Sequence, residues 1–384
     1  MVLGQRDNAI AVCLAFLRHV GIDWSPHPDE TAVQAEYARI RSQLGDRPIE
    51  TLIDLPPMED PASIGTVDVL IKLFVPASHT DANLASLTIC KATNLSLEHG
   101  NADASCVAYT NVPRVVGRRF GDYARAFQFG QLGCELAERR GLDHYEARTY
   151  LSYALFARRW AEPVRTTNDQ LRRAFDAANR TGDVPFGAFV CNSLAANLLF
   201  IGTPLAETQS EAERGLAYVK MKRFGLVIGF METQLALIRM LRGLTPAFGS
   251  LDDAQFNEAQ VEGRLPMGSI LNACWYWIRK LQARYVAGDH AGALEAASRA
   301  EPLLPAAHGF IEEGEYVFYS ALARAGLCTA MPADDRQPHM DILAAQQREL
   351  RIWADLCPEN FAGHATLGKT AAAGGGRMTN GQIA

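Results

Sequence analysis

The chain has 384 residues, of which 48% are hydrophobic and 21% are charged, a composition typical of a folded globular protein. Its 37 Lys and Arg against 43 Asp and Glu give a net charge of −6 at pH 7. Because no run of five or more basic residues occurs, the chain lacks the electrostatic signature of a nucleic-acid-binding protein.

The eight cysteines are scattered singly, without a C-x-x-C pair or the short Cys/His spacing of a zinc site. We therefore expect buried thiols, no bound metal and a reducing, cytoplasmic compartment. The N-terminus fits this location, since Arg6 and Asp7 precede only a short apolar run without the cleavage site of a secretory signal. This opening stretch is typical of the second helix of a repeat whose partner helix is absent.

Two Pro-rich loops, WSPHPDE and LIDLPPMEDP, follow, and a repeat then organises the chain. Gly100, Gly141, Gly182 and Gly225 each precede the start of a predicted helix, at spacings of 41, 41 and 43 residues. A second amphipathic helix lies between each pair of glycines. Two helices in about 41 residues predict an all-α fold, an α-solenoid of tetratricopeptide-like helix pairs.

The stretch from Val184 to Ala206 carries no charge over 23 residues and resembles a membrane span in composition. Pro185 and the Gly202-Thr203-Pro204 stop limit its helix to about 16 residues, ~24 Å, which is shorter than a hydrocarbon core of ~30 Å. We therefore predict a buried core helix and no membrane insertion.

Residues 243–269 are rich in turn-forming residues and predict a loop-like insertion, either a functional loop or a break between two helical stacks. The expected organisation is a first stack over 1–242, the insertion, a second stack over 270–362 and a disordered tail over 363–384.

The phrase CWYWIRK in the second stack is the candidate interaction site. Core packing is the favoured interpretation of its aromatic residues, with Trp277 facing inward. Trp275, Tyr276 and Arg279 are then the residues left to form a surface on which a protein partner docks. The nearby glutamates, Glu312, Glu313 and Glu315, are typical of a solvated face.

The segment Gly363–Thr370 matches G-x-x-x-x-G-K-[ST], the phosphate-binding loop of nucleotide-binding ATPases. No strand precedes it and AAAGGGRM follows it, so we interpret the match as accidental and expect no cofactor. The histidines are isolated and no catalytic motif occurs, so we predict no enzymatic activity.

Several phrases are distinctive, among them VCLAFLRHVGIDWSPHP, RFGDYARAFQFGQLG, LALIRMLRGLTPAFGSLDD, ACWYWIRKLQARYVAGD and WADLCPENFA. Over residues 6–362 the chain resembles the helical region of large bacterial signalling proteins. Those proteins join a kinase-like domain, an AAA-type ATPase module, a tetratricopeptide-like region and often a GAF and sensor histidine kinase unit.

The resemblance implies a non-catalytic regulatory or protein-interaction scaffold, whose partner is a protein or another domain of the same signalling system. It carries over no catalytic residue, because the H-R-D and D-F-G kinase motifs are missing. A nucleotide-binding signalling subunit that uses the tail is the alternative. Beyond residue 362 the family continues into further helices, so we expect this reading frame to be a gene fragment or one part of a split gene.

Overall fold

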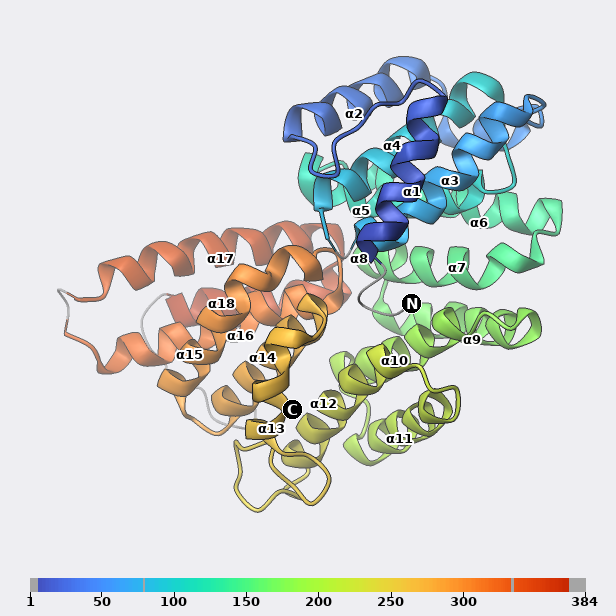
Figure 1. Ribbon diagram of the computed structural model, residues 1–384. Coiled ribbons are helices and arrows are strands. Elements are labelled where there is room, and N and C mark those ends of the chain that lie inside the picture. The colour runs from blue at the N-terminus through green and yellow to red at the C-terminus, as the bar shows by residue number, and fades with distance from the viewer. Residues whose placement is uncertain (1–5, 79, 333–334, 373–384) are drawn as a thin grey trace. The chain divides into compact units, whose positions relative to one another are not determined.

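The computed structural model describes residues 6–78, 80–332 and 335–372 and shows an all-α fold, in which no β-strand occurs among these residues (Figure 1). The all-α prediction is confirmed. The chain divides into two compact units, the first with residues up to 158 and 173–186, the second with 159–172 and the residues from 187 onward.

The first unit is built from helices that pack either on the next helix along the chain or on the one after it. Its elements are α1 (Arg6–His19), α2 (Glu30–Leu44), η2 (Ile49–Asp54), α3 (Pro61–Ala77), α4 (Ala82–His99), α5 (Ser105–Phe120), α6 (Tyr123–Arg140), α7 (Asp143–Tyr153) and the π-helical turn η3 (Ala154–Arg158). Gly133 sets the distance between α5 and α6, because a Cβ atom there would lie 2.5 Å from the carbonyl oxygen of Cys106. The small side chain therefore permits a close helix contact.

The second unit continues the helix pairs. Helices α9 (Val164–Thr181) and α10 (Val184–Phe200) contribute residues to both units. The remaining elements are α8 (Arg159–Ala161), α11 (Leu205–Met221), α12 (Gly225–Leu241), α13 (Glu258–Arg264), η4 (Leu265–Met267), α14 (Ile270–Val286), α15 (His290–Ala300), η5 (Glu301–Ala307), α16 (Ile311–Ala330), α17 (Gln337–Leu356) and α18 (Pro358–Ala372).

The 41-residue repeat is visible in the turns between helices. Gly141 and Gly182 follow the ends of α6 and α9 with φ angles of 64° and 75°, a left-handed conformation that glycine adopts without a steric penalty. The same turn recurs 41 residues after Gly182, where Arg223 and not Gly225 has the positive φ, 55°. The predicted spacing of 43 is therefore wrong for this turn, because Gly225 begins the next helix instead of ending the previous one.

The repeat also continues through the predicted insertion. Helices α10, α12, α14 and α16 begin at residues 184, 225, 270 and 311, so the spacing grows only from 41 to 45 residues where the insertion lies. Helix α12 packs directly on α14, and α13 with η4 occupies the place in the sequence of a second helix. The insertion at 243–269 replaces one helix of a pair and leaves the neighbouring helices in contact, which favours the functional loop over the break between two stacks.

A clasp between α18 and the start of the second unit joins parts of the chain far apart in sequence. The Asn360 side chain donates from Nδ2 to the carbonyl oxygens of Arg159 (2.8 Å) and Glu162 (2.9 Å), and its Oδ1 accepts from the Val164 N–H (2.8 Å). Phe361 stacks beside this contact on Trp160. We refer to these side-chain contacts of Asn360 and Phe361 as the clasp.

The clasp belongs to a helix that runs further than predicted. Helix α18 extends to Ala372, so the prediction of a disordered tail is wrong for residues 363–372, while 373–384 lie outside the described residues. Aromatic packing accounts for the difference, since the His364 ring lies 4.3 Å from Phe318 and 5.4 Å from Phe200 between ring centroids. This packing outweighs the low helix propensity of the glycines in the segment.

The uncharged stretch that begins at Val184 forms α10, and eight consecutive residues of it, 190–197, are buried inside the protein. The prediction of a core helix is confirmed. Across the described part of the chain, no helix combines the length and the apolar character that crossing a membrane requires.

Candidate functional site

The three residues predicted to form a docking surface lie on α14, but all of them are buried. Trp275, Tyr276 and Arg279 are 6%, 0% and 3% exposed. Trp275 meets Phe230 of α12 and Phe310 edge to face, at centroid distances of 4.6 and 5.3 Å. The surface prediction is wrong because α12, α15 and α16 all pack on α14, which leaves it little free face.

Arg279 is the centre of a buried group of charges. Its Nη2 donates to Glu312 (3.1 Å), and its Nη1 donates to Glu315 and to Gln282 Oε1 (2.9 Å). Gln282 in turn donates to Glu315 at 3.0 Å. The prediction that these glutamates form a solvated face is wrong, since Glu312, Glu313 and Glu315 are all buried. Partners are needed at this depth, because an unpaired buried carboxylate is strongly destabilising.

A second buried guanidinium, that of Arg159, lies near the same carboxylates. Burial lowers the pKa of Arg159 to about 10, although Glu312 and Glu315 act in the opposite direction. Its Nη2 donates to Asn197 Oδ1 at 2.7 Å, and Asn197 donates onward to Thr167 at 2.8 Å. Ion pairs of Arg279 thus join α14 to α16, and hydrogen bonds of Arg159 and Asn197 join α8, α9 and α10.

The pKa values of this group fit a structural role. Burial raises the pKa of Glu312, with Arg279 opposing it, whereas Glu315 and Glu312 outweigh the effect of burial on Arg279 and raise its pKa. A guanidinium held in its charged form by two carboxylates is suited to a structural role between packed helices.

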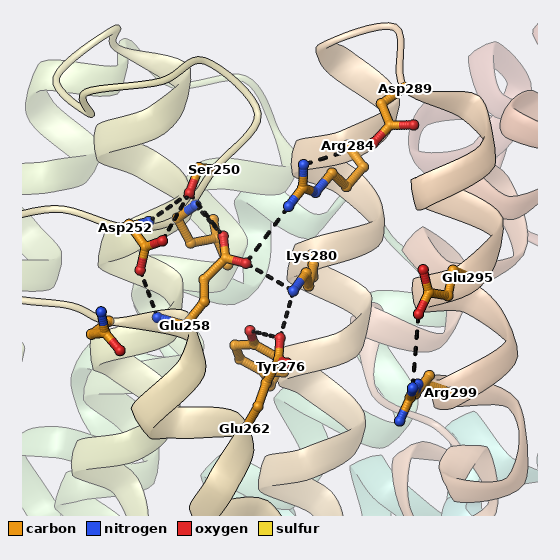
Figure 2. A network of polar contacts seen from close by, with 12 residues as sticks. Ser250, Asp252, Glu258, Glu262, Tyr276, Lys280, Arg284, Asp289, Glu295 and Arg299 are labelled. Atoms are coloured by element: carbon orange, nitrogen blue, oxygen red, sulfur yellow. Dashed lines mark hydrogen bonds and ion pairs between the residues drawn. The ribbon is translucent and has the colours of Figure 1, made fainter.

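Figure 2 shows a second polar network, which fixes the insertion on α14. Glu258 of α13 accepts from the Leu251 N–H (2.6 Å) and pairs with Lys280 of α14 (2.8 Å). Glu262, one turn later on α13, accepts from the Tyr276 hydroxyl at 2.6 Å and also pairs with Lys280. We call Glu258, Glu262, Tyr276 and Lys280 the insertion anchor. It explains the burial of Tyr276, whose hydroxyl finds its partner in the insertion.

The electrostatics of the insertion anchor favour fixed charges. Burial tends to raise the pKa of Glu258, but Lys280 and the Leu251 N–H outweigh it and hold that pKa below its usual value. Burial tends to lower the pKa of Lys280, but the two glutamates raise it above its usual value. A lysine whose pKa is raised keeps its proton at neutral pH and is a poor nucleophile. The network therefore holds the insertion in place and offers no activated group.

The anchored insertion and the helix ends beside it carry exposed apolar side chains, which the sequence analysis missed. Met267 is 76% exposed, Met221 68% and Ile270 52%. Leu244 and Phe248 of the loop before α13 are also exposed. Large exposed apolar groups on an ordered surface mark sites of interaction. One feature of the sequence does indicate the exposure of Met267. It lies between Pro266 and Gly268, outside any predicted helix that could bury it.

The segment Gly363–Thr370 lies within α18. A strand, a loop and a helix N-terminus are what the phosphate-binding motif requires, and a continuous helix provides none of these at this point. Within residues 6–372 apart from the short undescribed gaps, no group of three or more His, Cys, Asp or Glu side chains is arranged to bind a metal ion.

Comparison with known proteins adds no further identification. No protein-family model matches the chain, and no match was found among curated proteins. The surface is therefore interpreted from its own geometry and from the helical repeat.

Proposed function

We propose that the chain is a non-catalytic helical-repeat scaffold that binds a protein partner in a bacterial signal-transduction system, in the cytoplasm. Consecutive helix pairs create extended surfaces, and such surfaces are what repeat proteins use for recognition. The observation that carries the proposal is the insertion anchor. Its ion pairs and hydrogen bonds hold in one conformation an insertion that carries exposed apolar side chains. A pre-ordered surface binds with a smaller entropic cost than a flexible one.

The signalling part of the proposal rests on the resemblance of residues 6–362 to the helical region of kinase and ATPase hybrid proteins. A helical region between catalytic modules is suited to bind one of them and to influence its activity. The alternative, a nucleotide-binding subunit, depends on the Gly363–Thr370 motif, and the helical conformation of this segment does not favour it.

The test is to titrate the full chain with the purified kinase-like and AAA-type ATPase modules of such a hybrid protein. Isothermal titration calorimetry measures the binding of each module. We expect one module to bind with a Kd of about 1–100 μM, the range of regulatory contacts. An unrelated helical domain of similar charge serves as the control. If the folded, monodisperse chain gives no heat with any module, the proposed partner class is wrong.

A second titration addresses the alternative. ATP is added to the native chain and to Lys369→Ala, and binding is followed by the same method. Our proposal expects no binding by either protein. Tight binding that the substitution abolishes would favour the nucleotide-binding subunit instead.

A further inference from the structure

Three exposed apolar side chains of the second unit lie, along the chain, at or shortly before the first residues of α12 and α14, Met221 being the last residue of α11. Met221 lies one turn before α12, and Met267 and Ile270 lie at the start of α14. The two helix starts adjoin, because a Cβ atom on Gly229 of α12 would lie 3.0 Å from the Asn272 amide of α14. We call Met221, Met267 and Ile270 the methionine edge. Methionine is flexible and polarisable, and it is favoured on surfaces that accept varied apolar partners.

The methionine edge belongs to an ordered part of the chain. Met267 follows α13 by one turn, and α13 is held on α14 by Glu262, which pairs with both Tyr276 and Lys280 (Figure 2). On the other side, Lys220, which precedes Met221, pairs with Glu232 at 2.8 Å. Each side of the edge therefore lies next to an ion pair, and the pair of Glu262 with Lys280 is the more buried of the two.

Basic side chains flank these apolar groups. Lys222, Arg223 and Arg264 are exposed. Two acidic residues of this region are already engaged, since Glu232 pairs with Lys220 and Glu262 pairs with Lys280. The edge therefore presents apolar anchors within a positive rim, and a positive rim attracts and orients negatively charged partners.

Arg223 supplies an independent observation. It takes the left-handed turn position that Gly141 and Gly182 hold in the two preceding repeats, with a φ of 55°. A non-glycine residue pays a conformational penalty there, and residues held in such conformations concentrate at functional sites. The chain thus keeps a basic side chain at a position where glycine would stabilise the fold better.

We propose that the methionine edge docks an acidic amphipathic helix of a protein partner, whose apolar side chains at i and i+4 contact Met221, Met267 and Ile270. Acidic residues beside those anchors pair with Lys222, Arg223 and Arg264. The inference names the partner class for the scaffold function proposed above and rests on it. Helix docking through apolar anchors spaced by one turn is a recurring mode of peptide recognition.

The test uses an 18-residue helical peptide with leucines at i and i+4 and glutamates on its other positions, and a second peptide in which every glutamate is lysine. Fluorescence anisotropy measures the binding of each to the full chain. We expect the acidic peptide to bind at least about tenfold more tightly than the basic one, with an affinity that falls as salt rises.

Four variants identify the surface. Met267→Glu and Arg264→Glu should each weaken binding of the acidic peptide about tenfold, the range of an interface hot spot. Their controls, Ile352→Glu and Arg351→Glu, change exposed residues on α17 and should leave binding within about twofold of the native chain, since they lie outside the surface.

Arg223→Gly separates binding from stability. Relief of the left-handed strain should raise the melting temperature, whereas loss of the guanidinium should weaken peptide binding. If Arg223 had only a structural role, the substitution would change the melting temperature without weakening peptide binding. If Arg223→Gly or Met267→Glu binds the acidic peptide as the native chain does, or if both peptides bind equally, the inference is wrong.

Two other results would also overturn the inference, because each would assign the surface to a different partner. A dimer seen in sedimentation velocity and dissolved by Met267→Glu would assign the edge to a second copy of the chain. Binding to phosphatidylserine vesicles but not to the acidic peptide would assign it to a membrane. If a signalling module binds the chain and Met267→Glu does not change that binding, this inference fails while the proposed function stands. If the acidic peptide binds but no signalling module does, the proposed function fails while the peptide-binding surface stands.

Discussion

Trp160 of α8 stacks on Phe361 of α18 with ring centroids 5.5 Å apart and planes inclined by 13°. The contact joins the first and last helices of the second unit, and Asn360 reinforces it with hydrogen bonds to the backbone of Arg159, Glu162 and Val164. Stability of this unit therefore depends on one long-range contact as well as on contacts between neighbouring repeats.

Asn360→Ala should destabilise the second unit. Three buried backbone groups lose their partner, which we expect to reduce the free energy of unfolding by about 2–4 kcal/mol. Urea unfolding followed by the fluorescence of the tryptophans measures the change. Glu359→Gln, an exposed neighbour in the same helix turn, is the control and should cost less than about 0.5 kcal/mol. Equal effects of the two substitutions would contradict the importance of the clasp.

Two glycines should respond oppositely to alanine. At Gly133 the new Cβ meets the Cys106 carbonyl oxygen at 2.5 Å, so α5 and α6 must move apart, at a cost of about 1–3 kcal/mol. At Gly363, inside α18, the Cβ meets no atom within 4 Å, and the better helix propensity of alanine should stabilise by about 0.5–1 kcal/mol. Thermal unfolding of both variants distinguishes these cases. A stabilised Gly133→Ala would show that the two helices are not in close contact.

Arg279→Met should destabilise the protein in a pH-dependent way. The substitution leaves Glu312 and Glu315 without their main partner, at a cost of about 3–5 kcal/mol at pH 8. Burial already raises the pKa of Glu312, and loss of Arg279 removes the main opposing charge, so the remaining stability is greatest at low pH and is lost as pH rises through the folded pKa of Glu312. Denaturant unfolding at pH 5 and pH 8 measures the difference. A penalty that does not grow with pH would contradict the paired arrangement.

His364 should titrate far below the usual range. Burial lowers the pKa of this imidazole to about 4 from a model-peptide value of 6.5, because the ring lies between Phe200 and Phe318. A depressed folded pKa contributes stability above the unfolded value, and this contribution is lost as pH falls through the folded pKa. The imidazole resonances followed by NMR should have their midpoint near pH 4. A midpoint near 6.5 would mean that the ring is not buried between Phe200 and Phe318.

The helical repeat could be predicted because its signals are local. Glycines after the helices recur at the repeat length, and each helix carries its own apolar face, so neither requires knowledge of distant residues. The exception at Arg223 could not be predicted, since an arginine gives no indication of a left-handed turn. Only the spacing from Gly182 indicates it, once the structure is known.

The candidate site was less accessible to sequence reasoning because its partners are remote. Glu312 and Glu315 have the composition of a solvated segment, and their burial depends on Arg279, more than thirty residues earlier. Tyr276 has the character of a surface aromatic until its hydroxyl is matched with Glu262 in the insertion. Helical periodicity selects a single buried face and left Trp275 on the exposed side, whereas α14 is covered on several sides and Trp275 is buried. The inward orientation predicted for Trp277 agrees with its packing against the core.

The 45-residue spacing from α12 to α14 has a consequence for how such a protein can diversify. The helix pairs on either side keep their contacts although this repeat holds four residues more than its neighbours. Loop closure becomes only slowly more costly with length, so residues can be added or exchanged at this position with little loss of stability. The segment between Gly243 and Ser269 is thus the place where new recognition can evolve while the helical framework stays unchanged.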